Sequence, residues 1–308
     1  MKKISLAIHG GAGTILKSEM SDTMEKKYLA GLKDALKQGY NHLKSGGSAI
    51  EAAQLAVCSL EDNSLFNAGK GSVFSSNGTH QMDACIMEGE KLNAGAVCGV
   101  SGIKNPITLA RLVMDKSEHV LLSSKGAEEF GKLMKCKTEP ADYFYDEFRF
   151  KQWDRIKGSD QFQLDHSSKK SDKFGTVGAV ALDSNGNLAA ATSTGGMTNK
   201  KYDRIGDSPI VGAGTYANNK TCAVSCTGSG EYFIRGVVAY DVSCLMEMKN
   251  YSLQQACEEV IQNRIKKIGG DGGLIAVDKK GNISMPFNTE GMYRASKDYL
   301  GNENIEIY

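Results

Sequence analysis

The hydrophobic pattern of the first 60 residues predicts one strand followed by two helices. Residues 3–9 (KISLAIH) are a short apolar run that leads into glycines. Over residues 21–44 apolar positions recur at helical spacing, with acidic residues early and basic residues late. Ser48, with Glu51 three residues later, has the pattern of a capping box and predicts a second helix through Leu60.

Two further strands and two further helices are expected before the middle of the chain. Residues 81–89 (QMDACIMEG) and 93–103 (NAGAVCGVSGI) are apolar runs separated by a turn, which predicts a pair of strands. One helix is expected from Asn105-Pro106 to about residue 115, and another from Ser123 or Ser124 to about residue 134.

Beyond Thr176 the pattern changes to β-hairpins. Residues 176–194 predict two strands around Asn185-Gly186, and residues 272–288 repeat this design around Gly281. Between the hairpins we expect strands at 209–217 and 221–226 and helices at about 231–248 and 253–267. In total, the patterns predict about seven or more strands and about six helices. This set of elements fits a sandwich of two sheets with helices outside each.

Composition and charge exclude several classes of protein. The 308 residues include 37 basic and 36 acidic side chains, so no net field attracts nucleic acid or an anionic membrane. No stretch approaches the roughly 20 apolar residues of a membrane helix. The apolar run before Gly10 is too short for a signal peptide. We therefore expect a cytoplasmic protein that binds neither nucleic acid nor membranes.

The eight cysteines lie mostly inside apolar runs, which favours reduced core residues over a disulfide framework. Cys222 and Cys226 share one face of a predicted strand, but they lack the close pairing with other Cys or His residues that zinc sites show. We therefore expect no metal ion or cofactor in catalysis.

The step from Gly175 to Thr176 is the most informative feature of the chain. Residues 136–175 lose periodicity, and we expect a flexible polar linker over about 154–175 that ends where a core strand begins. A threonine in this position is well placed to become a new N-terminus, where its hydroxyl is the nucleophile and its own α-amino group the base. The alternative is a β-branched residue that simply suits a strand start.

Other motifs carry candidate chemistry, each with a structural alternative. The hairpin brings Thr194 beside Thr176, although threonine also fills strands. Thr227 and the amides of the CTGSGE segment are suited to an oxyanion, or to a plain helix cap. Arg204 and Asp207 can hold a zwitterion by its carboxylate and ammonium, or belong to a solvated loop.

Two glycine-rich segments remain. The segment 9–13 (HGGAG) lacks the lysine of a phosphate-binding loop and the full spacing of a dinucleotide fingerprint, so we expect instead a turn that lets backbone segments approach closely. The segment 65–73 (LFNAGKGSV) is a loop whose carbonyls can hold an alkali cation, which composition alone does not establish.

Taken together, these motifs resemble the plant-type L-asparaginases with isoaspartyl peptidase activity, which are N-terminal-nucleophile hydrolases, and especially their bacterial members. The match spans nearly the whole chain in order, except mainly residues 136–172. It is carried by HGGAG, LFNAGKGSV, MDACIMEG, AGAVCGV, NPITLARLVM, GTVGAVALD, ATSTGG, RIGDSP, GAGTYANN, AVSCTGSGE, GGDGGLIAVD and PFNTEGMYRA.

The resemblance implies one αββα domain over residues 1–308, of the α+β class, made as an inactive precursor. Self-cleavage between Gly175 and Thr176 would give an α subunit of residues 1–175 and a β subunit of residues 176–308. Thr176 would then attack the side-chain amide of L-asparagine or the β-linked peptide bond of an isoaspartyl dipeptide. The family also implies a dimer of αβ units.

The resemblance assigns the remaining catalytic roles by position. Thr194 would hydrogen-bond the nucleophile, and Asn67 would lie near it and help to order water. The Thr227 hydroxyl and the Gly228 amide would form the oxyanion hole.

It also implies a substrate clamp and a structural sodium site. Arg204 and Asp207 would grip the substrate's carboxylate and ammonium, with the Gly230 backbone assisting. The sodium ion would be held by backbone oxygens of Leu60, Glu61, Asn63, Phe66, Ala68 and Lys70.

Three other readings stay open at this point. A glycosylasparaginase of the same superfamily usually carries a signal peptide, and a taspase-type protease needs a longer chain. A non-catalytic binding protein of the same fold would not need intact Thr176, Thr194 and Thr227.

Overall fold

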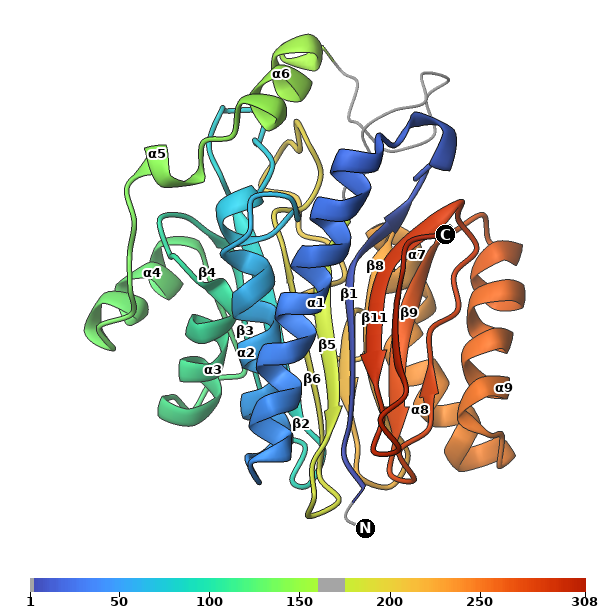
Figure 1. The fold of residues 1–308 in the computed structure, drawn as a ribbon. Helices are drawn as coiled ribbons and strands as arrows, with labels where there is room; N and C mark the ends of the chain where they lie inside the picture. The colour runs from blue at the N-terminus through green and yellow to red at the C-terminus, as the bar shows by residue number, and fades with distance from the viewer. Residues whose placement is uncertain (1–2, 160–174) are drawn as a thin grey trace.

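A computed structural model describes residues 3–159 and 175–308 and contains two β-sheets with helices packed against them (Figure 1). The larger sheet has eight strands, in the order β12 (Glu303–Glu306), β11 (Gly291–Lys297), β1 (Ser5–Gly13), β5 (Val177–Leu182), β6 (Leu188–Thr194), β2 (Met82–Glu88), β3 (Ala94–Val100) and β4 (Leu121–Ser123). The smaller sheet has four strands, in the order β10 (Ile283–Ser284), β9 (Gly272–Asp278), β8 (Cys222–Gly228) and β7 (Thr215–Ala217).

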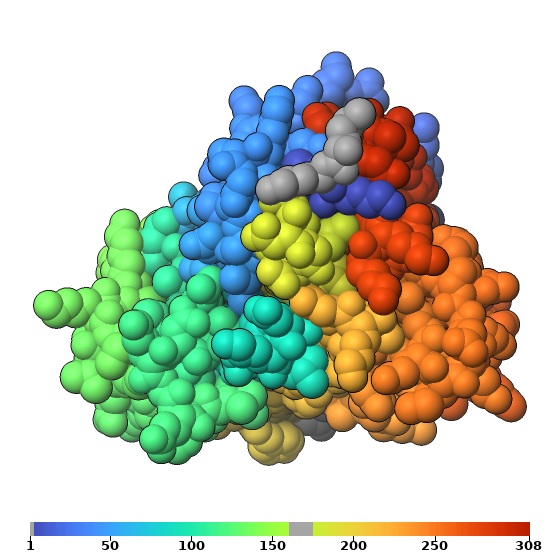
Figure 2. Space-filling view, turned by 90° about the horizontal axis from the view of Figure 1, so that it is seen from below, coloured from blue at the N-terminus to red at the C-terminus, as the bar shows by residue number. Residues whose placement is uncertain are grey.

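The register of the larger sheet places Thr176 and the end of β6 side by side. Val177 pairs with Ser193 in the antiparallel β5–β6 hairpin, as the Asn185-Gly186 turn predicted. His9 of β1 pairs with Gly178 on the other side of β5. The head of β5, the end of β6 and the end of β1 therefore meet at one end of the molecule, near α6 in Figure 1. The opposite end is formed by hairpin turns, including the yellow β5–β6 turn in Figure 2.

Helices α1 (Asp22–Lys44), α2 (Ala49–Glu61) and α3 (Pro106–Lys116) pack on the larger sheet. The Ser21 side chain caps α1, and Ser48 and Glu51 form the predicted capping box of α2. Each such cap contributes about 1 kcal/mol by satisfying an otherwise free backbone amide. These predicted helices are confirmed with boundaries within a residue or two.

The smaller sheet is covered by α8 (Val238–Lys249) and α9 (Leu253–Glu258), the latter extended by a π-helical segment, η3 (Glu259–Ile265). The single helix predicted over residues 231–248 is wrong. Val237 is left-handed (φ +48°) and separates α7 (Gly230–Gly236) from α8. The break lets the first amides of α8, those of Ala239 and Tyr240, donate to the carbonyls of Ala213 and Gly212.

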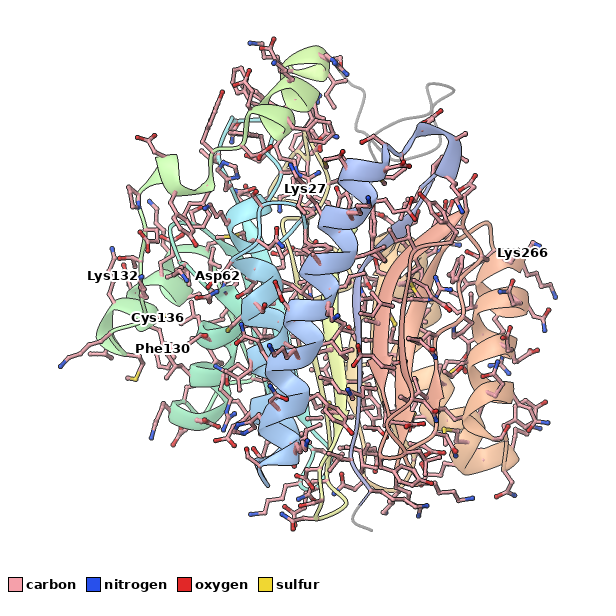
Figure 3. All side chains as sticks on the ribbon, in the orientation of Figure 1. Lys27, Asp62, Phe130, Lys132, Cys136 and Lys266 are labelled. Atoms are coloured by element: carbon pink, nitrogen blue, oxygen red, sulfur yellow. The ribbon has the colours of Figure 1, made fainter. Side chains whose placement is uncertain are left out.

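Apolar side chains fill three layers between these elements (Figure 3). One core cluster lies between α1–α3 and the larger sheet, a second between the smaller sheet and α7–α9, and a third between the two sheets. Cys222 and Cys226 both lie in the second cluster, as their spacing on one strand face predicted. The fold is therefore a mixed α/β arrangement of two sheets with helices.

Several further predictions need correction. The strand expected over 209–217 is limited to β7, because the preceding residues form turns. Strands β4, β11 and β12 were not predicted. The turn expected at HGGAG is wrong, since β1 continues through Gly13 with a bulge between His9 and Gly11.

The region expected to be irregular contains short helices after α4 (Ser124–Leu133), namely α5 (Ala141–Phe144) and α6 (Glu147–Ile156). Helix α6 is held by ring contacts of Phe150 and Trp153 with Phe74, at centroid distances of 5.9 and 5.7 Å. Such long-range packing leaves no periodic signal in the sequence. The predicted linker therefore does not begin at 154, and its residues 160–174 lie outside the described part of the chain.

Among the helices of the described residues, none is both long and apolar enough to cross a lipid bilayer.

Candidate active site

Thr176 lies at the head of β5 and is 8% exposed. Its hydroxyl oxygen is 3.4 Å from the Oγ of Ser208, on the loop that follows the Arg204 region. Because Val177 pairs with Ser193, the next pair in register is Thr176 with Thr194. The structure thus brings Thr194 across from the candidate nucleophile, as the hairpin predicted.

Gly175 is enclosed by backbone and hydroxyl groups of β1 and β8. A Cβ atom at residue 175 would lie 2.6 Å from Thr227 Oγ1 and 2.8 Å from the Cα of Gly11. Thr227 is fully buried, and its hydroxyl oxygen accepts a hydrogen bond from the Ala12 amide at 3.2 Å. The Thr227 hydroxyl therefore lies directly beside the residue whose carbonyl would be attacked. The expected close backbone approach of the HGGAG segment is confirmed here.

Gly228 ends β8 and Gly230 begins α7, so the predicted strand-to-helix junction is confirmed. Gly228 has φ +148°, and a Cβ atom there would lie 2.4 Å from the Asp271 carbonyl oxygen. Only glycine fits this conformation. The turn is tied down by Ser229, whose amide and hydroxyl both donate to Asp271.

Asn67 holds the turn that follows Thr194. Its side-chain amide donates to the Gly196 carbonyl at 2.7 Å, and its backbone carbonyl accepts from the Gly195 amide at 3.0 Å. The Thr194 hydroxyl oxygen accepts from the Gly196 amide at 3.0 Å. The structure thus brings Asn67 to Thr194, the residue predicted to hydrogen-bond the nucleophile.

Arg204, Asp207 and Gly230 converge in space. A Cβ atom on Gly230 would lie 2.9 Å from Arg204 Nη2 and 3.0 Å from Asp207 Oδ1. Arg204 donates from Nε and Nη2 to the two carboxylate oxygens of Glu231, at 2.8 and 3.0 Å. This fork-to-fork pair fixes the guanidinium in one plane. Glu231 was not predicted as a site residue, although it directly follows the CTGSG junction.

Asp207 is 3% exposed, and its Oδ2 accepts no hydrogen bond from the described residues. Burial raises the pKa of Asp207 to about 7, while the nearby Arg204 guanidinium acts in the opposite direction. A buried carboxylate oxygen without a donor is costly to keep ionised unless a cation reaches it. The Asp207 side chain is therefore suited to binding an ammonium group of a ligand.

This pKa leads to a prediction for the pH dependence. If Asp207 binds the substrate ammonium as a carboxylate, kcat/KM should rise with pH through about 7, because the acid form dominates below that value. The α-amino group of a mature Thr176, with an unperturbed pKa of about 8, must also lose a proton to act as the base. Two ionisations would then control the acidic side of the profile of kcat/KM against pH. We expect the slope of log kcat/KM against pH to fall from about two to about one in Asp207→Asn.

The control for this prediction is Asp241→Asn, because Asp241 is another carboxylate with an arginine nearby, Arg264, but lies on α8. A pH profile that is identical in wild type and Asp207→Asn would show that Asp207 does not control binding.

A buried chain of hydroxyl groups between the sheets was not predicted. His9 Nε2 lies 2.9 Å from Ser225 Oγ, which lies 2.7 Å from Thr192 Oγ1, and the Thr215 hydroxyl donates to Thr192 Oγ1 at 2.7 Å. The Oγ1 atom of Thr215 also lies within hydrogen-bond distance, 3.1 Å, of the Ser208 carbonyl oxygen. Burial lowers the pKa of His9 to about 3, so this ring is neutral. This row of hydroxyl groups supports Ser208, the neighbour of the Thr176 hydroxyl. In the sequence, its only sign is the presence of polar residues inside apolar strands.

Comparison with known proteins identifies the family. The family model described as asparaginase matches residues 2–307. The chain is 50% identical over 298 residues to an isoaspartyl peptidase of Salmonella typhimurium, covering 96% of this chain and 95% of that protein. It is also 50% identical over 298 residues to an isoaspartyl peptidase of Escherichia coli, covering 96% of this chain and 93% of that protein.

A more distant relative is a probable isoaspartyl peptidase/L-asparaginase of Arabidopsis thaliana, 40% identical over 325 residues, with 99% of this chain and 98% of that protein covered. The chain belongs to the asparaginase family. The resemblance found in the sequence motifs is thereby confirmed, for bacterial and plant-type members alike.

In this asparaginase-family chain, the segment expected to hold sodium is a tightly curled loop after α2. A Cβ atom at Gly71 would lie 2.1 Å from the Phe66 carbonyl oxygen and 2.6 Å from that of Ser64, so these two carbonyls turn into the curl of the loop, and Phe66 is one of the expected sodium ligands. The buried Arg149 holds the outside of the loop by donating to the carbonyls of Gly71 and Leu65, at 3.1 and 3.4 Å. A loop lined by inward carbonyl oxygens fits a hard alkali cation.

One oxygen of the Glu61 carboxyl group is already hydrogen-bonded within the protein. It is fully buried, and its Oε1 accepts from the Ser193 hydroxyl at 2.6 Å and the Ile107 amide at 3.0 Å. Burial raises the pKa of Glu61 to about 8, opposed by these hydrogen bonds. The family resemblance assigns the sodium contact to the backbone carbonyl of Glu61 rather than to this carboxyl group.

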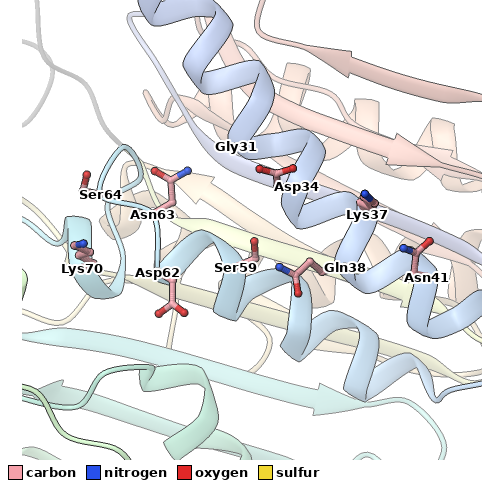
Figure 4. Close-up of a pocket in the computed structure, with 10 residues that line it drawn as sticks. All are labelled: Gly31, Asp34, Lys37, Gln38, Asn41, Ser59, Asp62, Asn63, Ser64 and Lys70. Atoms are coloured by element: carbon pink, nitrogen blue, oxygen red, sulfur yellow. The ribbon is translucent and has the colours of Figure 1, made fainter.

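A groove of about 830 Å³ lies between α1 and the end of α2, next to this loop (Figure 4). Its lining is polar and charged, including Asp34 and Lys37 from α1 and Asn63 and Lys70 from the loop. Thr176, Arg204 and Asp207 are not among its lining residues, so the groove is separate from the candidate active site of this asparaginase-family member.

Proposed function

We propose that the chain is a threonine hydrolase that cleaves its own Gly175–Thr176 bond and then hydrolyses L-asparagine and β-aspartyl dipeptides. The observation that carries the proposal is the position of Gly175-Thr176, with Thr227 against the glycine and Thr194 across from the threonine. The names of its relatives, isoaspartyl peptidase and L-asparaginase, support the same substrates.

In maturation, the Thr176 hydroxyl oxygen attacks the Gly175 carbonyl carbon. The peptide C–N bond breaks, the proton of the hydroxyl passes to the departing nitrogen, and the chain is joined by an ester. Water then hydrolyses this ester, which leaves a free carboxyl group on Gly175 and a free α-amino group on Thr176. The hydroxyl of Thr227 lies where it can donate to the oxyanion of this step.

In the mature enzyme, the α-amino group of Thr176 takes the hydroxyl proton as the oxygen attacks the β-carbonyl carbon of the substrate. The Thr227 hydroxyl and Gly228 amide stabilise the oxyanion, and ammonia or an amino acid leaves with the proton. Water then releases aspartate from the ester. Arg204 and Asp207 select substrates with a free α-carboxylate and α-ammonium, which asparagine and β-aspartyl dipeptides share.

The test is an assay of the purified protein on β-aspartyl-leucine and L-asparagine. α-Aspartyl-leucine serves as the linkage control and N-acetylglucosaminyl-asparagine as the glycosylasparaginase substrate. We expect release of leucine and of ammonia from the first two and much slower turnover of the controls. Turnover of the glycosylated substrate alone, or of none, would contradict the proposal.

Several finer features belong to the same proposal. The helices on the outer faces of the two packed sheets support an αββα sandwich of the N-terminal-nucleophile type. The inward carbonyls of the loop after α2 support a structural sodium ion. We further propose cytoplasmic location, one domain cut into residues 1–175 and 176–308, and a dimer of these αβ units.

A further inference from the structure

The turn after Thr194 is held from two sides by buried side chains. Asn67 donates to the Gly196 carbonyl, as described above. On the other side, the ammonium group of Lys200 donates to the Gly195 carbonyl at 3.1 Å. A Cβ atom at Gly195 would lie 2.4 Å from Asn67 Oδ1, and one at Gly196 would lie 2.9 Å from Lys200 Nζ. Gly195 thus leaves room for the side chain of Asn67, and Gly196 leaves room for that of Lys200.

Lys200 is an unusual residue in this position because it is only 3% exposed. Lysine is almost never buried unless its charge has partners. Here Nζ also donates to the Gln81 carbonyl at 2.5 Å. The buried Asp83, which pairs with Thr194 across β2 and β6, supplies opposite charge nearby. A buried ammonium group that contacts the active-site turn does not serve solubility, so we expect Lys200 to have a role at this turn.

One planar peptide unit links Lys200 to Thr194. The Gly195 carbonyl, which accepts from Lys200, and the Gly196 amide, which donates to Thr194 Oγ1, belong to the same peptide bond. Because this unit is rigid, fixing its carbonyl end also fixes its amide end. A cation on the carbonyl also polarises the peptide and strengthens the amide as a donor.

We propose that Lys200 is a positioning residue of the hydrolase reaction, which orients and polarises Thr194 through the Gly195–Gly196 peptide. The Thr194 hydroxyl oxygen accepts a hydrogen bond from the Gly196 amide. The hydroxyl proton of Thr194 therefore points away from that amide and can be donated to the hydroxyl oxygen of Thr176. This inference rests on the proposed function. The Arg204 guanidinium makes its hydrogen bonds with Glu231 rather than with the turn, so the contacts that fix its position do not pass through Lys200.

The test uses Lys200→Met, which keeps the length of the side chain but removes its charge and donors. Kinetics on β-aspartyl-leucine are normalised to the matured fraction, measured by intact mass. We expect kcat to fall about 10- to 100-fold. We expect KM to stay within about twofold of the wild-type value, the usual scatter for an uncoupled site. Lys220→Met, the same change at an exposed lysine, is expected to leave both constants unchanged.

A double-mutant cycle separates positioning from general support of the fold. In a Thr194→Ala background, Lys200→Met should lower kcat by less than about twofold further, because its effect passes through the missing hydroxyl. If the losses in kcat of Lys200→Met and Thr194→Ala multiplied fully in the double variant, the proposal would be overturned. A wild-type kcat in Lys200→Met would overturn it as well. If Lys200→Met does not fold, Lys200→Leu, which also lacks charge and donors, replaces it with the same expectations. A wild-type protein without any hydrolysis would instead contradict the proposed function.

Discussion

Replacing Thr176 with alanine is expected to leave the chain uncleaved and to lower hydrolysis of β-aspartyl-leucine by about 10⁴-fold or more. The substitution removes both the attacking oxygen of maturation and the nucleophile of turnover. The fold should persist, because within the described residues the Thr176 hydroxyl loses only one hydrogen bond, of 3.4 Å to Ser208. Thermal unfolding, a denaturing gel and a dipeptidase assay on one preparation measure all three consequences.

The matched control is Thr221→Ala. Thr221 is also buried, and its hydroxyl makes a 2.6 Å hydrogen bond with Ser243 at the other end of β8. Its loss should cost about 1 kcal/mol of stability and leave maturation and turnover unchanged. Hydrolysis by uncleaved Thr176→Ala at a rate near that of the wild type would show that another residue is the nucleophile.

Arg204→Ala is expected to abolish most substrate hydrolysis while maturation continues. Loss of a guanidinium that binds a desolvated carboxylate typically costs about 2–5 kcal/mol, so kcat/KM should fall by about 30-fold or more. Self-cleavage is intramolecular and has no α-carboxylate to bind, so it should keep its wild-type rate. Both quantities are measured in one preparation, by intact mass over time and by initial rates.

Arg264→Ala is the control for Arg204, because Arg264 also donates to both oxygens of one carboxylate, that of Asp241 on α8. It should leave both reactions unchanged. If Arg204→Ala matured slowly but turned over substrate normally once cut, Arg204 would belong to maturation rather than to the substrate clamp.

The local pattern of the sequence predicted most helices and hairpins near the site. Capping residues such as Ser48 and the Asn185-Gly186 turn act over a few residues, so a single sequence reveals them. Helix α6 and the break at Val237 depend on contacts with Phe74 and with the carbonyls of Gly212 and Ala213. Such contacts between distant segments produce no periodicity.

The same distinction separates the predicted from the unpredicted site residues. Thr194 is brought to Thr176 by a hairpin, which sequence alone predicts. The grouping of Thr227 with Arg204 and Asp207 came from a family resemblance, and the described geometry places Thr227 beside Gly175 and Arg204 beside Asp207. Lys200 and Glu231 contact these residues through a backbone carbonyl and an ion pair. Lys200 lies outside the motifs, and Glu231 ends the CTGSGE segment without having been assigned a role.

The central claim is that the Gly175–Thr176 bond is the first substrate of this protein and the origin of its nucleophile. Intact-mass analysis of the purified wild-type chain, under denaturing conditions and over a time course, tests it most directly. We predict two fragments, one ending at Gly175 and the other beginning at Thr176, that accumulate as the full-length mass disappears. A chain that stays whole after long incubation while hydrolysing β-aspartyl-leucine would contradict the claim.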